Sequence, residues 1–371
     1  MDDIWVIILV IILVIVVVLV NRKHMESLLP EAIMLAIGGG KLLRSSNHAS
    51  AKKSYLYVNK PSMPRDILPL SQLPRYITPD MPKMKFTPNA NHNGWQSDGW
   101  GQRKLMLNEI DFLAKYYDPT RIQRVVYAGA APGTHFDYIV KLFPKCMFEL
   151  IDPRKFDIKE QDRVAIYQGF FEDHMAATYK GKNVLFMSDI RTMEIDGMSI
   201  DDRRVDAKKR ETVIKQDMDR QMKWAELMEP QAAMFKMRLP YTSGKTRYYD
   251  GDICLQPWAP LESTELRLIT DCKKYKEYDH TTYEEIMFFI NSMLRPGINT
   301  GYDIGNARLN NRLDTCLEYL ILRDYIDKHD PPSNYEKIIA MMREISKIIG
   351  QPNRMPFDAR YIVTSCKSTS Q

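Results

Sequence analysis

Four charged residues in this 371-residue chain lie where charge is costly. Asp189 ends one apolar run, Lys236 lies inside another, Glu265 begins a third, and Lys104 lies early in a segment with helical periodicity. A lysine in apolar surroundings has a lowered pKa and can act as a base near neutral pH, while neighbouring acids orient and tune it. If the four side chains meet around one cleft, they could deprotonate a sugar hydroxyl.

Each of these residues also has an ordinary structural interpretation. Lys236 could be an edge-strand lysine whose ammonium reaches water, and Asp189 could cap a helix. Lys104 and Glu265 could lie on solvated faces. Residue type and position alone leave both interpretations open.

A glycine-rich loop between a predicted strand and a predicted helix indicates a ligand site. Gly129 and Gly133 allow the backbone to approach a ligand closely. Asp152 ends the next predicted strand, 23 residues after Gly129, where an acid can bind ribose hydroxyls. The spacing G-x-x-x-G, stiffened by Pro132, favours a nucleoside without phosphates over a dinucleotide, and disfavours a nicotinamide oxidoreductase, which would carry G-x-G-x-x-G. The combination predicts a ribose-bearing cofactor.

The elements that must position these residues alternate between short apolar runs and segments long enough for crossover helices, which indicates an α/β fold with a largely parallel sheet. The predicted parallel strands are 124–128, 147–151, 164–168, 184–188 and 232–237. A further strand over 264–270 has no preceding crossover helix and is predicted to be antiparallel, at the end of the sheet. The predicted helices are 102–117, 283–294, 305–327 and 335–349.

The composition, 44% hydrophobic and 27% charged, is typical of a globular protein and excludes a disordered, collagenous or wholly membrane-embedded chain. Five cysteines, no two of them close in sequence, indicate neither a disulfide framework nor a zinc site. The net charge of +5 fits an anionic partner without identifying one.

The first 94 residues differ from the rest of the chain. Ile4 to Val20 is an uninterrupted apolar run followed by Arg22 and Lys23, which predicts a membrane anchor with everything after it in the cytosol. A buried terminal strand or helix is the alternative. Seven prolines between Pro61 and Pro88 then predict an extended arm.

Six ordered motifs between Trp95 and Ile349 carry a resemblance to a known family. They are Gly101-Gln102-Arg103-Lys104, Tyr127-Ala-Gly129-Ala-Ala-Pro-Gly133-Thr-His135, Asp152-Pro-Arg154, Asp189-Ile-Arg191, Lys236-Met-Arg238, and Gln256-Pro-Trp-Ala-Pro with Glu265-Leu-Arg267. In these the chain resembles the poxvirus-type cap-specific mRNA (nucleoside-2'-O-)-methyltransferases. In poxviruses that protein is also the regulatory subunit of poly(A) polymerase.

The resemblance implies a role for each matching residue. The family's catalytic tetrad falls on Lys104, Asp189, Lys236 and Glu265, with Lys236 activating the 2'-hydroxyl. The implied contacts to S-adenosylmethionine are Gln102, Tyr127, Gly129, Gly133, Asp152, Arg154 and, through its backbone, Phe171. The implied cap-binding residues are Arg238, Tyr241, Ser263 and Glu284. Two positions depart from the family: Ser243 replaces a second cap-reading acid, and the first stacking aromatic is either Phe86 or Tyr76.

The resemblance also implies a fold, an activity and an organisation. The expected fold is a Rossmann-like class I S-adenosylmethionine-dependent methyltransferase sheet with helices on both faces, C-terminal helices and a preceding transmembrane helix. The expected activity is methylation of the first transcribed nucleotide of capped mRNA, and the alternative is a non-catalytic RNA-binding subunit of a viral poly(A) polymerase, whose catalytic subunit would be a partner. The predicted segments are an anchor (1–23), a tether and arm (24–94), a methyltransferase domain (95–350) and a tail (351–371). The predicted location is a viral factory or virion membrane, as a single-pass protein.

Overall fold

The computed structural model describes residues 66–86, 100–192, 207–260, 263–295, 300–305, 309 and 311–350. All of them lie in one compact unit, Val58–Gln371. None of the helices in these ranges is both long and apolar enough to cross a membrane. The prediction of a single-pass membrane protein is therefore corrected, because the described helices give it no support. The apolar run on which it depended and the predicted tail lie outside the described residues.

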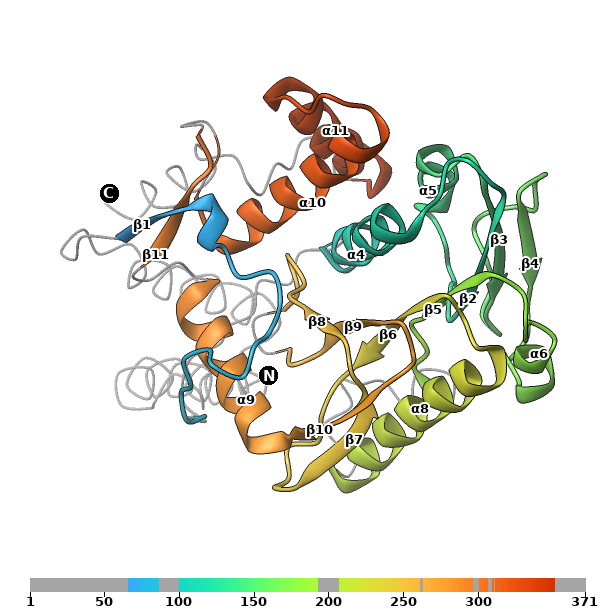
Figure 1. Ribbon diagram of the computed structural model, residues 1–371, viewed down its shortest axis with the longest axis horizontal. Helices are drawn as coiled ribbons and strands as arrows, with labels where there is room; N and C mark the ends of the chain where they lie inside the picture. Colours follow the sequence, from blue (N-terminus) through green and yellow to red (C-terminus); the bar gives the residue numbers. More distant parts are fainter. Residues whose placement is uncertain are drawn as a thin grey trace, which may run out of the picture. The chain divides into compact units, whose positions relative to one another are not determined.

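A seven-stranded sheet forms the centre of this unit, in the order β4-β3-β2-β5-β6-β9-β8 (Figure 1). Its strands are β2 (Gln123–Ala128), β3 (Cys146–Ile151), β4 (Val164–Tyr167), β5 (Val184–Ser188), β6 (Ala232–Met237), β8 (Asp252–Cys254) and β9 (Leu266–Thr270). The five strands β4, β3, β2, β5 and β6 are parallel to one another, and β9 is antiparallel to both β6 and β8. The α/β class with a mostly parallel sheet is thus confirmed.

The apolar runs explain which strands were predictable. The five parallel strands occur where expected: β2, β3, β5 and β6 are mostly buried and read as apolar runs, and the short edge strand β4 is apolar although half of its residues are exposed. The antiparallel direction of β9 is also confirmed. Its place at the end of the sheet is wrong, because β8 lies outside it. Three residues are too few to form a recognisable apolar run.

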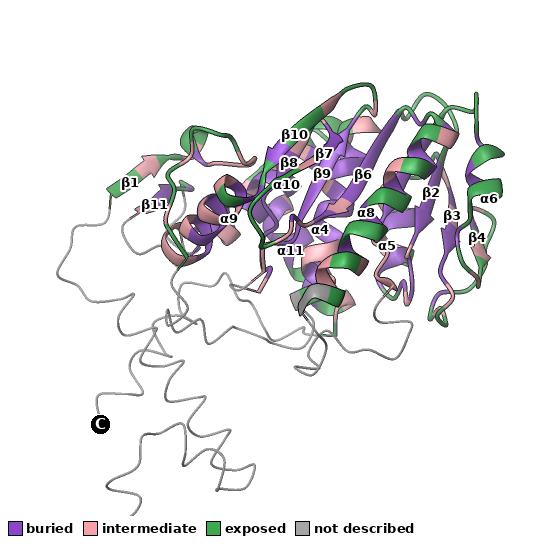
Figure 2. Ribbon diagram, turned by 90° about the horizontal axis from the view of Figure 1, so that it is seen from below, coloured by how far each residue is buried: buried purple, intermediate pink, exposed green. Residues whose placement is uncertain are grey.

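Helices cover both faces of the sheet, whose central strands are buried (Figure 2). One face carries α4 and α5, and the other carries α6 and α8 (Figure 1). These helices are α4 (Trp100–Tyr116), α5 (Phe136–Leu142), α6 (Asp173–Ala177) and α8 (Ala207–Met228). From β2 the chain runs outward through β3 to β4, then returns to the other side of β2 for β5 and β6. Ligands of open α/β sheets bind at such a switch point, outside the carboxyl ends of the strands.

The described part of the proline-rich arm runs along the outer edge of the sheet. The Leu255 N–H donates to Arg75 O at 2.9 Å, and the Ile77 N–H donates to Ile253 O at 2.8 Å. The arm therefore pairs with β8 and covers backbone groups that a sheet edge would leave open. Upstream, β1 (Asp66–Pro69) and a 3-10 turn (Leu70–Gln72) precede this stretch, and β1 pairs in parallel with β11 (Thr300–Asp303).

The remaining elements follow the sheet in sequence. They are β7 (Lys245–Tyr249), β10 (Tyr275–Asp279), α9 (His280–Phe289), a π-helical turn (Ile290–Leu294), α10 (Leu313–His329) and α11 (Tyr335–Ile348). The helix predicted from residue 305 begins only at Leu313. The antiparallel pair of β7 and β10 was not predicted.

A buried ion pair attaches the start of α4 to the C-terminal helices. The Nε of Arg103 donates to Glu318 Oε2 at 2.9 Å, and its Nη1 donates to Ser346 Oγ at 2.9 Å. Trp258 Nε1 donates to the same Glu318 oxygen at 2.6 Å. Arg103, Glu318 and Ser346 are all buried, where an unpaired charge would be costly. The pair thus fixes the backbone position next to Lys104.

Candidate active site

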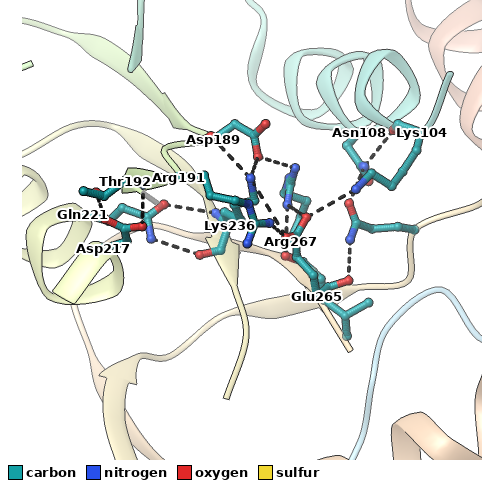
Figure 3. A network of polar contacts seen from close by, with 12 residues as sticks. Lys104, Asn108, Asp189, Arg191, Thr192, Asp217, Gln221, Lys236, Glu265 and Arg267 are labelled. Atoms are coloured by element: carbon teal, nitrogen blue, oxygen red, sulfur yellow. Dashed lines mark hydrogen bonds and ion pairs between the residues drawn. The ribbon is translucent and has the colours of Figure 1, made fainter. Parts of the chain in front are cut away.

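The four predicted catalytic side chains come from four different elements and meet in one cluster (Figure 3). Lys236 Nζ lies 2.9 Å from Asp189 Oδ1 and 4.0 Å from Glu265 Oε2. Lys104 Nζ lies 3.3 Å from Glu265 Oε1. Asp189 follows β5 and Lys236 is near the end of β6, so both lie at the carboxyl ends of parallel strands. Glu265 precedes β9, whose antiparallel direction brings its start to the same edge.

Two arginines complete the cluster, and the sequence interpretation gave neither of them a role. Arg267, only 1% exposed, donates from Nη2 to Asp189 Oδ1 at 2.6 Å and from Nη1 to Glu265 Oε1 at 3.1 Å. Arg191 forms an ion pair with Glu265. The sequence offers no signal for either arginine beyond its position two residues after a predicted catalytic acid. The site therefore holds two guanidinium groups, two amines and two carboxylates.

The excess of basic groups changes the protonation of both lysines. Burial lowers the pKa of Lys236 to about 7, and the guanidinium groups of Arg191 and Arg267 contribute to the shift. Burial likewise lowers the pKa of Lys104 to about 7, with Arg267 the next cause. Each lysine can therefore exchange a proton near neutral pH.

The pKa of Asp189 is also lowered, which for a carboxyl favours the charged form. Burial alone would raise the pKa of its carboxyl, but the cationic Lys236 and Arg267 outweigh burial and hold the pKa well below its usual range. Asp189 is accordingly a carboxylate at neutral pH. It accepts hydrogen bonds and orients Lys236 but does not supply protons.

The glycine loop lies directly against the backbone of Asp189. Gly129 has φ +86°, and a Cβ there would lie 2.7 Å from the carbonyl carbon of Asp189. The Asp189 N–H donates to Ala128 O at 2.9 Å. Gly133 has φ +69°, and its Cβ would lie 3.2 Å from Ile158 Cγ2. Both glycines are therefore required by conformation and close approach, and Gly129 links the loop directly to the catalytic cluster.

Asp152 is fixed beside the same loop. Its carboxylate, 2% exposed, accepts from the Ala131 N–H at 3.2 Å. Arg154 donates to both carboxylate oxygens, at 3.0 Å from Nε and 2.9 Å from Nη2, and also to Ala131 O at 3.0 Å. The Arg154 N–H also donates to Oδ1 at 2.9 Å, so each carboxylate oxygen accepts two hydrogen bonds. In the structure, therefore, Arg154 holds the acid and the loop together.

The other predicted cofactor contacts lie on both sides of the loop. Gln102 Oε1 is 3.2 Å from Nδ1 of the buried His135, whose Nε2 is 2.6 Å from Glu109 Oε2. Tyr127 is buried on β2, and burial raises the pKa of its hydroxyl well above the usual value. The ring of Phe171 packs in the core, 4.9 Å from the Trp224 ring, so only its backbone is available to a ligand.

The predicted cap-binding residues form a group next to Glu265. The Arg238 guanidinium lies 4.3 Å from the centre of the Tyr241 ring. The Tyr241 hydroxyl is 3.1 Å from Thr264 Oγ1, and Ser263 Oγ accepts from the Glu265 N–H at 3.2 Å. The stacked ring of Tyr241 is thus joined to the predicted catalytic residue Glu265 through three consecutive residues, 263–265.

Phe86 and Tyr76 are the two candidates for the first stacking aromatic, and they lie in different places in the structure. Tyr76 forms a β-bridge to Cys254 at the sheet edge. Phe86 is 49% exposed and lies edge-on to Phe288 of α9, at 5.4 Å between ring centres. Since Glu284 lies one turn before Phe288 on the same helix, the structure places Phe86, and not Tyr76, along the helix that carries the predicted cap-reading acid.

The pKa of Glu284 is raised, first by burial and then by the neighbouring Glu285. Met84 of the arm donates its N–H to Glu285 O at 3.1 Å. The arm therefore contacts α9 directly at the position of this acid.

Among the residues that the structure describes, no group of three or more His, Cys, Asp or Glu side chains is arranged to hold a metal ion.

The fold and this cluster define an α/β protein with a glycine loop and a lysine–carboxylate cluster at the switch point of its sheet. Residues 72–351, which are 280 of the 371, match the family described as poly A polymerase regulatory subunit. The chain belongs to this family. The family predicted from the sequence is thereby confirmed.

Curated relatives agree with this assignment. A fowlpox virus (strain NVSL) protein is 24% identical over 284 residues, which cover 70% of this chain and 87% of the relative. A myxoma virus (strain Lausanne) protein is 26% identical over 274 residues, covering 68% and 77%. Both are named cap-specific mRNA (nucleoside-2'-O-)-methyltransferase.

One solved chain, from bluetongue virus VP4, described as a multifunctional RNA-capping protein, is 13% identical with a TM-score of 0.36. The match covers 87% of this chain and 62% of that one. At this TM-score the likeness supports no conclusion about the present site.

Replacing Gly129 by alanine should destabilise the protein more than the same change at Gly181. Both glycines have positive φ, but a Cβ at Gly181 would meet nothing within 4 Å, whereas at Gly129 it would meet the Asp189 backbone. The extra cost of moving that backbone is about 1–3 kcal/mol in free energy of unfolding. Urea denaturation of the two variants measures it, and equal losses would contradict the close approach.

Proposed function

We propose that this chain is a cap-specific mRNA (nucleoside-2'-O-)-methyltransferase, which transfers a methyl group from S-adenosylmethionine to the 2'-hydroxyl of the first transcribed nucleotide. The observation that carries the proposal is the 2.9 Å contact between Lys236 Nζ and Asp189, with the pKa of Lys236 lowered to about 7, beside a glycine loop. The names of the fowlpox and myxoma relatives support the same reaction.

The residues present fit S-adenosylmethionine. Gly129 and Gly133 form the positive-φ turn that follows β2, and the buried Asp152 lies beside this turn at the end of β3, where an acid of an open α/β sheet can bind ribose hydroxyls. We assign Gln102, Tyr127, Asp152, Arg154 and the Phe171 backbone to its binding. When bound, it supplies an electrophilic methyl group at the switch point of the sheet.

Lys236 acts as the base. As a neutral amine it donates one N–H to Asp189 and keeps its lone pair for the proton of the 2'-hydroxyl. Burial, and after it the positive charges of Arg191 and Arg267, lower the pKa of Lys236 to about 7, so a large fraction of the amine is neutral at neutral pH. After proton transfer, the carboxylate of Asp189 stabilises the new ammonium.

Lys104 and Glu265 contribute alignment. Glu265 holds Lys104 on one carboxylate oxygen and lies 4.0 Å from Lys236 on the other, so it fixes the spacing between the two amines. Lys104 then faces the substrate ribose from the α4 side of the site. Alignment is a main requirement of an in-line methyl displacement.

The cap would be held next to this centre. Arg238 covers one face of the Tyr241 ring, so a guanine base would stack on the other face. Phe86 and Glu284 belong to the arm and α9, which meet at Glu285. We assign Phe86 as the second stacking ring and Glu284 as the acceptor for the guanine edge, with Ser263 positioned by Glu265. Because Ser243 replaces a second acid, Glu284 carries this recognition.

Replacing Lys236 by alanine should lower kcat for transfer to the first-nucleotide ribose by about 10²- to 10⁴-fold, because the base is lost. The assay is transfer of radiolabel from S-adenosylmethionine to capped RNA. Lys141→Ala, an exposed lysine on α5, is the control and should leave kcat unchanged. Transfer by Lys236→Ala at the wild-type rate, or its absence in the wild-type protein, would overturn the proposal.

The pH dependence of kcat/KM should report the basic form of Lys236. Only the neutral amine accepts the proton, so kcat/KM should fall tenfold per pH unit below a midpoint near 7 and level off above it. Removing the cation in Arg191→Met should move the midpoint upward, and removing the anion in Asp189→Asn should move it downward. Midpoints that stay in place in both variants would contradict this account.

The second candidate function is that of a regulatory subunit of a viral poly(A) polymerase, and the description of the matched family favours it. Co-expression with a poly(A) polymerase catalytic subunit from a large DNA virus, followed by affinity capture, tests the partnership. We expect a stable complex that also forms with Lys236→Ala, since the Lys236 side chain is only 13% exposed and its loss changes little of the protein surface. Absence of a complex would exclude this role.

A further inference from the structure

The strand that carries Lys236 extends beyond its neighbour. The last register pair of β5 with β6 joins Ser188 to Phe235, so Lys236 has no strand partner on that side. On its other side, Lys236 is paired with Arg267 of β9. The β5 chain leaves the sheet at this point to present Asp189. Two backbone groups of Lys236 therefore need a partner that the sheet does not supply.

The side-chain amide of Gln221 is that partner. Its Nε2 donates to Lys236 O at 2.9 Å, and its Oε1 accepts from the Lys236 N–H at 3.2 Å (Figure 3). Gln221 belongs to α8 and is 1% exposed. A second bond from Nε2 to the Tyr248 hydroxyl, at 3.4 Å, sets which end of the amide faces which group. The amide thus takes the place of a missing strand at one residue only.

One turn earlier on α8, Asp217 holds the loop that carries the other half of the catalytic pair. The Thr192 N–H donates to Asp217 Oδ2 at 3.1 Å, and the Thr192 hydroxyl donates to Oδ1. Arg220 also donates to the Thr192 hydroxyl, at 2.8 Å. Residues four apart on a helix share a face. A single face of α8 therefore contacts both the 189–192 loop and the backbone of Lys236.

We propose that Gln221 is a positioning residue for methyl transfer, and that Gln221 and Asp217 together form an α8 clamp that sets the separation of Lys236 and Asp189. The inference rests on the proposed role of Lys236 as the base. A neutral amide suits this place because it supplies one donor and one acceptor without adding a charge beside a lysine whose protonation matters. The three residues of β6 before Lys236, which are Ala233, Met234 and Phe235, are paired by strands on both sides, so the amide serves the position of Lys236 specifically.

Gln221→Met tests the clamp, because methionine has nearly the same shape and makes neither hydrogen bond. We expect kcat to fall about 10- to 100-fold, with KM for S-adenosylmethionine and for capped RNA within twofold of wild type. Gln216→Met, an exposed position on the same helix, is the matched control and should change neither. Wild-type kcat in Gln221→Met, with or without a lower melting temperature, would reduce Gln221 to a structural role and overturn the inference.

Gln221→Glu provides a second, independent readout if the methionine variant does not fold. A protonated carboxyl offers one donor and one acceptor in the same geometry, whereas a carboxylate offers only acceptors and repels Lys236 O. The ratio of kcat in Gln221→Glu to kcat in wild type should therefore rise as pH falls. A ratio that does not change with pH would contradict the paired hydrogen bonds.

Lys236→Ala, measured in the same assays, distinguishes a failure of the proposed function from a failure of the clamp. If Lys236→Ala transfers methyl groups normally, the proposed function fails and the clamp loses its purpose. If Lys236→Ala is inactive while Gln221→Met is normal, only the clamp fails.

Discussion

The candidate site depends on a lowered lysine pKa beside a carboxylate: the Lys236 side chain is 13% exposed and that of Asp189 is 19% exposed. Lys236 and Asp189 are 2.9 Å apart, a distance at which opposite charges would ordinarily hold the lysine protonated. Burial and the guanidinium groups of Arg191 and Arg267 oppose this and bring the pKa of Lys236 to about 7. Two arginines therefore help to set the protonation of Lys236, and these arginines are themselves bound by Asp189 and Glu265.

The fold supplies the positions that this balance requires. The turn at Gly129 lets the Asp189 backbone approach the end of β2, and Gln221 holds the backbone of Lys236 where β5 departs. The antiparallel β9 brings Glu265 to the edge of the sheet formed by carboxyl ends. Arg103, buried against Glu318, fixes the start of α4 and so the approach of Lys104. Each contact joins elements that are distant in sequence, which is why a compact α/β core is needed to assemble four polar side chains.

The sequence predicted the parallel strands and the four central residues because both leave local signals. A buried strand is an apolar run, and Lys236 within such a run is conspicuous. The arginines of the cluster and Gln221 leave no such signal: a glutamine on an amphipathic helix looks solvent-facing until the end of β5 is known. Strand β8, three residues long, and the pairing of β7 with β10 depend on contacts with distant chain segments. The choice of Phe86 over Tyr76 likewise required the path of the arm along α9.

We expect Lys236 to be half-deprotonated near neutral pH, and titration of the Lys236 side chain is the most direct test. In protein labelled with carbon-13 at the lysine ε-carbon, the Lys236 resonance can be assigned by its absence from the spectrum of Lys236→Arg. Its chemical shift, followed by NMR from pH 5 to pH 11, should turn at a midpoint near 7. A midpoint near the ~10.4 of an unperturbed lysine would contradict the account.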